Sequence, residues 1–290
     1  MLFWGNFNFI ERLEVINMIL SGLKYMFVDL DGTALCSKKN ISSELLASLK
    51  KLKCNHMEIF IVTGRSPGDS LQFYRLLELE TYMVNFNGNM VWNPRTHEIL
   101  YTNFFESSNK ILRYIINNYS QFEIKSIALS SNLSNVFGGN NDSKLIELLS
   151  DKEIENKYID IHSLKNIKNI QRIILSINPE NKPVCIASLS KIFPNIDIFE
   201  WTDRHDIVDI NIKNSSKWNA ICRIINKIGG DLDKTICFGD SRTDLDMIIG
   251  AAVGVAMKNS DMNILQFADY ITERDNNHNG LNHFIESYLL

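Results

Sequence analysis

Short runs of apolar residues, separated by amphipathic segments, dominate the first ninety positions of the chain. Residues 25–28, 58–62 and 82–86 are largely apolar and of strand length, as expected for strands buried in a parallel sheet. Residues 42–53 place leucines at helical spacing behind a serine N-cap, and Pro67 starts a second helical segment that extends to about Leu79. Strand, helix, strand, helix, strand is the order of a doubly wound α/β sheet.

The pattern changes between residues 89 and 206, where the strand-like pieces mix polar with apolar positions. The expected strands span 99–103, 124–129, 171–177 and 196–200, and the expected helices span 107–119, 143–149 and 183–192. Mixed polarity is typical of a sheet with one solvated face. The asparagine-rich stretch 138–142 is expected to be a turn. We therefore predict a separate α+β domain inserted into the first.

Alternating buried strands and helices return at residue 207. The expected strands span 207–212, 235–238, 254–257 and 270–271, and the helices span 218–228, a segment ending at 249, 261–267 and 281–290. The predicted fold class is α/β, with a doubly wound, Rossmann-like parallel-sheet core (23–88 and 207–290) and an inserted α+β cap (89–206). Residues 1–22 are predicted to be an amphipathic extension, or Met18 is the true start.

Composition narrows the possible functions. The net charge is -4 and 45% of the residues are hydrophobic, so the chain can bury a core but lacks the basic surface that nucleic acid requires. Basic residues are scattered and the apolar runs are too short to span a bilayer, so no membrane association is expected. The five cysteines form no CxxC pair, which favours buried free thiols in a reducing cytoplasm.

The first candidate for chemistry is the pair Asp29 and Asp31, directly after the first apolar run. Residues two apart in a strand point the same way. Two carboxylates that close need a cation or a shared proton. An acidic turn is the alternative explanation, since Asp-Gly is a common turn dipeptide. The glycine spacing does not fit an EF-hand loop, and the chain has no Gly-Lys-Ser/Thr sequence of a Walker loop.

Polar residues mark other predicted strand ends and helix starts. Thr63 follows the second apolar run, Lys217 precedes a helix, and Asp240 and Asp244 follow the strand at 235–238. Each alone has a common explanation: a cap for the threonine, solvated surface for the lysine and a turn for the aspartates. Ligands of doubly wound sheets bind beyond the carboxyl ends of the strands, so the shared position of these residues indicates a site.

This set resembles the haloacid dehalogenase-like (HAD) phosphohydrolase superfamily, and more closely its Cof-type branch, over the chain from about Lys24. The matching motifs are 29–33 (Asp-Leu-Asp-Gly-Thr), 63–65 (Thr-Gly-Arg), Lys217 and 239–244. Segments 87–88, 255–257 and 268–280 also resemble that branch. One position departs from it: branch members usually carry asparagine before the last aspartate, and Thr243 stands here with a shorter side chain.

The resemblance implies a cytoplasmic, Mg²⁺-dependent phosphatase that hydrolyses a small phosphorylated metabolite through an aspartyl-phosphate. Sugar phosphates, nucleotides and phosphorylated vitamins are the substrate classes considered. The implied roles are catalysis by Asp29 and Asp31, phosphate binding by Thr63, Gly64, Lys217 and Thr243, and Mg²⁺ binding by Asp29, Asp31 (through its backbone carbonyl), Asp240 and Asp244. Two alternatives stay open, a phosphomutase of similar architecture and a catalytically silent binding protein on the same fold. The sequence gives no indication of the oligomeric state.

Overall fold

The computed structural model describes residues 20–140, 142–151, 153–201 and 204–290. Two compact units divide the chain: the first comprises Met1–Thr63, Phe73–Leu100 and Ser216–Leu290, and the second comprises Gly64–Gln72 and Tyr101–Ser215. Most of the predicted N-terminal extension, including Met18, lies outside the described residues. The predicted bounds of the insertion, 89–206, stay a prediction.

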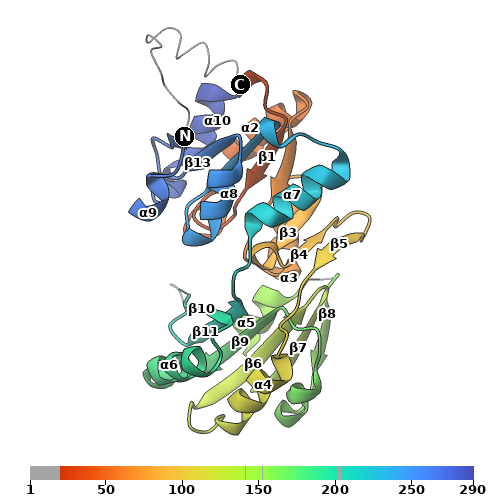
Figure 1. Ribbon diagram of the computed structural model, residues 1–290, viewed down its shortest axis with the longest axis vertical. Coiled ribbons are helices and arrows are strands. Elements are labelled where there is room, and N and C mark those ends of the chain that lie inside the picture. Colours follow the sequence, from red (N-terminus) through yellow and green to blue (C-terminus); the bar gives the residue numbers. More distant parts are fainter. Residues whose placement is uncertain (1–19, 141, 152, 202–203) are drawn as a thin grey trace. The chain divides into compact units, whose positions relative to one another are not determined.

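A five-stranded parallel sheet forms the centre of the first unit (Figure 1). Its strand order is β14-β13-β12-β1-β2. The strands are β1 (Tyr25–Val28), β2 (Glu58–Ile61), β12 (Thr235–Gly239), β13 (Val253–Ala256) and β14 (Tyr270–Ile271). All four residues of β1 are buried, as expected for a central strand covered on both faces. The predicted α/β class with a parallel sheet is therefore confirmed.

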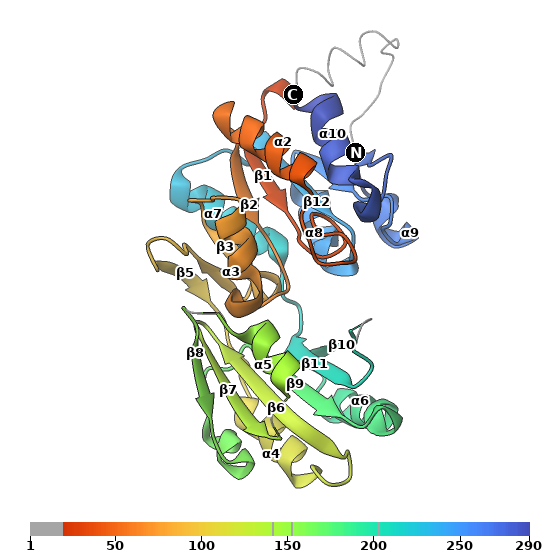
Figure 2. The same cartoon turned by 180° about the vertical axis from the view of Figure 1, so that it is seen from behind.

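Helices cover both faces of this sheet. α2 and α10 pack against one another on one face, and α7 and α8 on the other (Figures 1 and 2). The helices of the unit are α2 (Ser43–Cys54), α7 (Lys217–Ile228), α8 (Leu245–Gly250), α9 (Met262–Leu265) and α10 (Gly280–Tyr288). α3 (Pro67–Leu76) begins in the second unit and ends in the first.

The strand predicted at residues 82–86 forms and runs parallel to the end of β2, but its ladder pairing lies in a second, three-stranded sheet and not in the five-stranded one. β3 (Met83–Asn85) belongs to a three-stranded sheet with β4 (Met90–Trp92) and β5 (Ile99–Thr102). It pairs antiparallel with β4 because the tight turn at Phe86–Gly88, where Asn87 has a φ of 53°, reverses the chain. The contact with the end of β2 is an isolated parallel bridge from Val62 to Val84.

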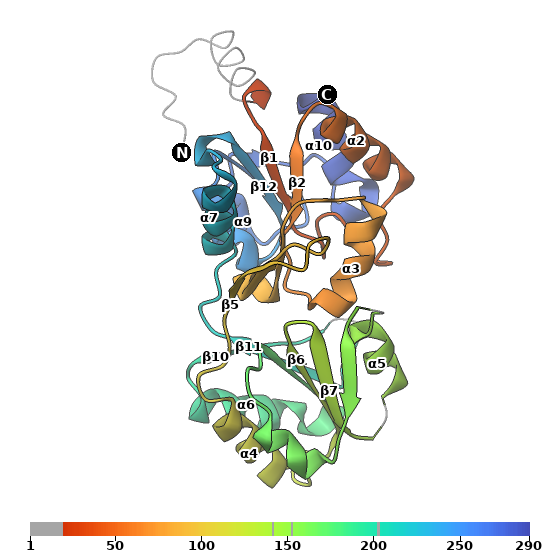
Figure 3. The ribbon, with the colours of Figure 1, turned by 90° about the vertical axis from the view of Figure 1, so that its right-hand side faces the viewer.

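The second unit is built on a six-stranded sheet of order β10-β11-β9-β6-β7-β8. The strands are β6 (Ile124–Ser131), β7 (Ser134–Gly139), β8 (Glu155–Tyr158), β9 (Arg172–Ile177), β10 (Ile196–Phe199) and β11 (Ile207–Ile212). α4 (Ser108–Asn117) and α6 (Lys182–Ile192) lie on one face, and α5 (Ser143–Leu149) lies on the other (Figure 3). Short 3₁₀ turns occur at 161–166, 179–181, 232–234, 242–244 and 276–278.

The prediction that residues 207–212 return to the parallel sheet is wrong. β11 pairs antiparallel with both β9 and β10. Its alternate residues Asp209 and Asn211 are buried, and the Arg172 guanidinium of β9 donates to both Asp209 oxygens, at 2.9 and 2.5 Å. Because the ion pair with Arg172 allows Asp209 to be buried, both faces of β11 are buried although one face carries polar residues. The sequence of β11 was therefore interpreted as a strand of the parallel core.

Candidate active site

The parallel register brings two aspartates to the same edge of the first unit's sheet. Val28 of β1 pairs with Phe238 of β12, and the Asp29 backbone N donates to the Phe238 carbonyl at 3.0 Å. Asp29 therefore follows the end of β1 next to the end of β12, where Asp240 begins the following loop. Both predicted residues lie beyond the carboxyl ends of parallel strands, where α/β folds bind ligands.

Asp244 is fixed by the turn that leads from β12 into α8. Its Oδ2 accepts hydrogen bonds from the backbone N of Asp240 at 3.1 Å and of Ser241 at 2.9 Å, and from Ser241 Oγ at 3.0 Å. These bonds form a capping box around Ser241, a device that satisfies the free amides of a helical start. Asp244 is fully buried, and its other carboxylate oxygen faces Lys217.

Lys217 is the first residue of α7, and its Nζ donates to Asp29 Oδ1 at 2.7 Å and to Asp244 Oδ1 at 2.5 Å. Ser216 caps the helix, and its Oγ donates to Asp246 Oδ2 on α8 at 2.5 Å. Gly88 packs against this start, because a Cβ there would lie 2.2 Å from the Ser216 carbonyl oxygen. The helix start is thus anchored from α8 and from the turn after β3.

Three carboxylates crowd one volume beside this lysine. Oxygens of Asp29, Asp240 and Asp244 all lie within 4.8 Å of one another. Lys217 is 1% exposed, and its single ammonium leaves a surplus of negative charge when all three acids are ionised. Buried charges are costly unless they are paired or coordinate a cation, so this donor set of carboxylate oxygens fits a hard divalent cation.

Burial and mutual repulsion perturb the acids of this cluster. Burial raises the pKa of the Asp29 carboxyl well above its usual range; Lys217 opposes the rise, and Asp244 and Asp240 add to it. Burial and the neighbouring Asp244 raise the pKa of Asp240 to about 7. Burial lowers the pKa of Lys217, but Asp244 and Asp29 outweigh it, so the net shift is upward. Lys217 is therefore an ammonium ion, and the raised pKa values are those of Asp29 and Asp240.

A comparison with known proteins places the chain in a family. The family model described as haloacid dehalogenase-like hydrolase matches residues 26–285. The chain belongs to the haloacid dehalogenase-like hydrolases. The curated phosphatase YitU of Bacillus subtilis, a 5-amino-6-(5-phospho-D-ribitylamino)uracil phosphatase, is 26% identical over 271 residues, 90% of this chain and 96% of the relative.

Solved HAD structures share the fold of the chain. A haloacid dehalogenase-like hydrolase from Bacteroides thetaiotaomicron superposes with a TM-score of 0.77 at 22% identity, covering 91% of this chain and 99% of that one. A sugar phosphatase of HAD subclass IIB superposes with a TM-score of 0.70 at 20% identity, covering 91% and 98%. The fold with its inserted cap is therefore that of the family.

Three more of the predicted site residues of this HAD chain follow the ends of strands β1 and β2. Asp31 is on the loop after β1 with its side chain 40% exposed, and Lys39 Nζ lies 2.9 Å from its Oδ1. Thr63 follows β2 and is buried; its backbone N donates to the Val84 carbonyl at 3.0 Å. Gly64 is next in the chain and opens the segment counted with the second unit.

Thr243, the position that departs from the Cof-type pattern, contacts its own turn. Its Oγ1 lies 2.8 Å from Ser241 Oγ, and either hydroxyl can donate in this bond. Sequence reasoning did not assign roles to Thr33 and Asp246, although both lie inside or beside recognised motifs. Thr33 Oγ1 donates to Asp240 Oδ1 at 3.1 Å, and Asp246 anchors the start of α7.

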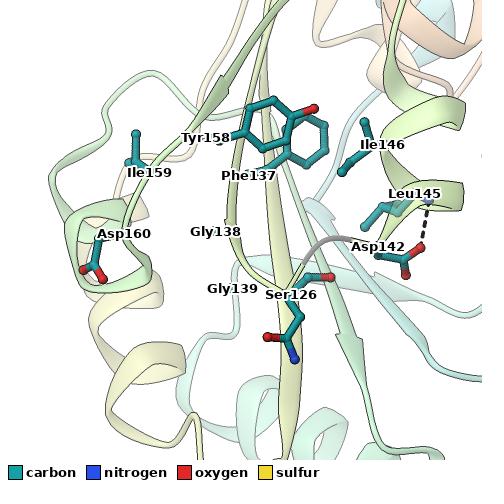
Figure 4. A pocket seen from close by; sticks show the side chains of 11 residues that line it. Ser126, Phe137, Gly138, Gly139, Asp142, Leu145, Ile146, Tyr158, Ile159 and Asp160 are labelled. Carbon is teal, nitrogen blue, oxygen red and sulfur yellow. Dashed lines mark hydrogen bonds between the residues drawn. The ribbon is translucent and has the colours of Figure 1, made fainter.

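The second unit of this HAD chain has a cavity of its own, of about 250 Å³ (Figure 4). Phe137 and Tyr158 stack beside it with ring centroids 5.3 Å apart, and α5 contributes Leu145 and Ile146 to its wall. None of the residues that line it is a predicted site residue. The residues predicted for chemistry therefore lie elsewhere.

The structure can be compared with two expectations from composition, the absence of membrane spans and the burial of the cysteine thiols. Among the described residues, every helix is too short or too polar to traverse a lipid bilayer. All five cysteines are free thiols; Cys185 and Cys237 are buried, but Cys36 and Cys222 are partly exposed and Cys54 is exposed. The expectation of buried thiols therefore holds for Cys185 and Cys237 and fails for Cys54, which ends α2 beyond its buried leucines, and for Cys36, which lies in a loop.

Proposed function

We propose that this protein is a Mg²⁺-dependent phosphatase that hydrolyses a small phosphorylated metabolite through an aspartyl-phosphate on Asp29. The observation that carries the proposal is the buried cluster in which Asp29 contacts Lys217 and lies within 4.8 Å of Asp240 and Asp244. Catalysis of phosphoryl transfer depends mainly on positioning and on neutralising spread negative charge. A carboxylate nucleophile beside an ammonium and a cation site meets both needs.

Asp29 is arranged to present one oxygen to the substrate. Lys217 holds Oδ1, and Oδ2 accepts no hydrogen bond from any described residue. Oδ2 would form the bond to phosphorus while the bond between phosphorus and the leaving oxygen breaks. The backbone bond from Asp29 N to Phe238 and the Lys217 contact fix the direction of approach.

Asp31 would supply and recover the proton. Its carboxyl is more exposed than that of Asp29, so it can reach a leaving group at the edge of the cluster. It would give a proton to the leaving oxygen, and then take one from the water whose oxygen attacks the phosphorus and releases Asp29. Thr63, Gly64, Lys217 and Thr243 are proposed to bind the phosphate oxygens.

Asp240, Asp29 and Asp244, with the Asp31 backbone carbonyl, would hold the Mg²⁺. The bound ion would neutralise part of the charge that otherwise keeps a phosphate away from a carboxylate nucleophile. The residues fit this ion, because Mg²⁺ prefers carboxylate and carbonyl oxygens. The loop after β1 also approaches closely: a Cβ on Gly32 would lie 2.1 Å from Asp240 Oδ2.

The experiment is phosphate release from a panel of sugar phosphates, nucleotides and phosphorylated vitamins, with Mg²⁺ or with EDTA. The names of the relatives add 5-amino-6-(5-phospho-D-ribitylamino)uracil to that panel. We expect Mg²⁺-dependent release that Asp29→Asn abolishes and Asp233→Asn, an exposed control, retains. Isomerised phosphosugar without free phosphate would instead indicate a mutase, and no turnover of any substrate would contradict the proposal. Substrate choice is proposed to reside in the inserted segment predicted at 89–206.

A further inference from the structure

Three asparagine side chains hold the loop that carries Asp31. Asn259 Nδ2 donates to the Gly32 carbonyl at 2.8 Å, and Asn276 Nδ2 donates to the Leu35 carbonyl at 2.8 Å. The Ser37 backbone N donates to Asn277 Oδ1, also at 2.8 Å. We call Asn259, Asn276 and Asn277 the asparagine clamp. Its members come from the loops after β13 and β14, more than 200 positions away in the sequence.

Further hydrogen bonds fix the clamp residues and their own loops. The Asn276 backbone N donates to Asn259 Oδ1 at 3.0 Å, so one amide side chain links the two loops. Thr272 Oγ1 accepts from the Lys258 backbone N at 2.9 Å and donates to the Arg274 carbonyl at 2.7 Å. Because Asn259 Oδ1 already accepts from Asn276, the Asn259 side chain has lost its freedom to rotate. Its bond to the Gly32 carbonyl therefore costs little further conformational entropy.

The bond from Asn259 acts at the point where the loop is most constrained. Gly32 has a φ of +75°, and its Cα faces Asp240 so closely that no side chain fits. Gly32 directly follows Asp31, so the carbonyl that Asn259 holds lies one residue from the Asp31 backbone. The ion pair between Asp31 and Lys39 is exposed, and exposed ion pairs constrain geometry weakly.

We propose that Asn259 is a positioning residue for Asp31, and that Asn276 and Asn277 support it. This inference rests on the proposed phosphatase function. An amide is the suitable group because it donates to Gly32 and accepts from Asn276 at once. Asn276 and Asn277 lie in the segment 268–280 that resembles the Cof-type branch, and Asn259 follows the resembling segment 255–257; none of the three has a part in the proposed nucleophile, cation or phosphate sites.

The test compares Asn259→Ala with Asn263→Ala, an exposed asparagine in α9 of the same unit. We expect kcat to fall about 10- to 100-fold in Asn259→Ala, since small misplacements of a catalytic group have effects of that size. KM and the urea midpoint should stay near wild type, because Thr63 and Lys217 are untouched. Asn263→Ala should behave as wild type.

Substrates with different leaving groups distinguish a loss of Asp31 positioning from a general loss of structure. An alkyl phosphate needs a proton from Asp31, whereas p-nitrophenyl phosphate releases a stable phenolate. The loss in kcat/KM should therefore be several-fold larger on the alkyl phosphate. Asn259→Asp keeps the size and the acceptor for Asn276 but cannot donate to Gly32, so it should lose as much as alanine. Faster hydrogen exchange across residues 30–37 should accompany both variants.

Equal losses on the two substrates, a change confined to KM, or a fall in kcat that tracks the urea midpoint would overturn the positioning role. Wild-type kcat in Asn259→Ala would overturn it too, and would leave the phosphatase proposal standing. A wild-type protein that releases no phosphate from any substrate would overturn both.

Discussion

Replacing Asp240 by asparagine should stabilise the metal-free protein while it abolishes the response to Mg²⁺. Burial and the neighbouring Asp244 raise the pKa of Asp240 from 3.8 to about 7. The folded protein therefore holds a proton at pH values where the unfolded chain has released it. Because the folded state binds more protons, the free energy of unfolding falls as the pH rises from about 4 to about 7.

The size of the stability change follows from the rise in the pKa of Asp240. A rise from 3.8 to about 7 corresponds to roughly 4 kcal/mol, at about 1.4 kcal/mol for each pH unit. Asp240 is partly exposed, and solvent screening reduces the figure to about 1–3 kcal/mol. Asp240→Asn removes the charge and keeps an oxygen that accepts from Thr33 Oγ1. We expect it to be more stable than wild type by about 1–3 kcal/mol at pH 8 in EDTA, and equal to it near pH 4.

Urea unfolding at pH 4, 6 and 8, in EDTA and in Mg²⁺, measures both effects. Wild type should gain about 3 kcal/mol when Mg²⁺ is near 100 times its dissociation constant, and Asp240→Asn should gain little. Asp233→Asn, on the exposed turn before β12, controls for the loss of one charge. A variant less stable than wild type at pH 8 in EDTA, or a metal-free wild type that gains stability from pH 4 to 8, would refute the reasoning.

Three further substitutions probe the same cluster. Asp29→Asn should lower kcat by at least about 1,000-fold, measured by phosphate release, while circular dichroism stays unchanged. Lys217→Met should destabilise the protein by about 3–5 kcal/mol at pH 8 in EDTA, because it leaves Asp29 and Asp244 buried without their ammonium; a urea midpoint equal to wild type would contradict this. Gly32→Ala should weaken Mg²⁺ binding at least about tenfold in calorimetry, since its Cβ would displace Asp240 and its φ is +75°; unchanged affinity would show that the loop adapts.

The strand ends of the parallel sheet were predictable because the signals there are local. The strands β1 and β12 are short apolar runs that stop at an aspartate, and the start of α7 is announced by a serine before Lys217. These strand ends and the helix start can be recognised from neighbouring residues, without knowledge of distant contacts. The convergence of these points followed from the rule that parallel strands share a carboxyl edge.

The elements that the sequence did not reveal depend on distant partners. β8 is a short edge strand with mostly exposed residues, so it shows no alternation of apolar and polar positions. β7 ends in the glycines that were predicted to begin a turn. β11 resembled a core strand because Arg172, far away in sequence, neutralises its buried Asp209. The asparagine clamp likewise joins residues whose sequence contexts give no sign of contact.

A second cluster supports the proposal that the carboxylates around Lys217 are a functional site and not a structural ion network. In the second unit, Arg204 pairs with Asp142 and Asp206, again two acids to one base. There the hydrogen bonds from Arg204 lower the pKa of Asp206 to about 2, so both charges are satisfied. Around Lys217 the pKa of Asp240 rises instead, because burial and the neighbouring Asp244 disfavour its charged form. A carboxyl whose charged form is disfavoured in this way lowers the stability near neutral pH, and strongly perturbed pKa values cluster at functional sites. The surplus negative charge that destabilises the metal-free protein is the charge that a bound divalent cation would neutralise.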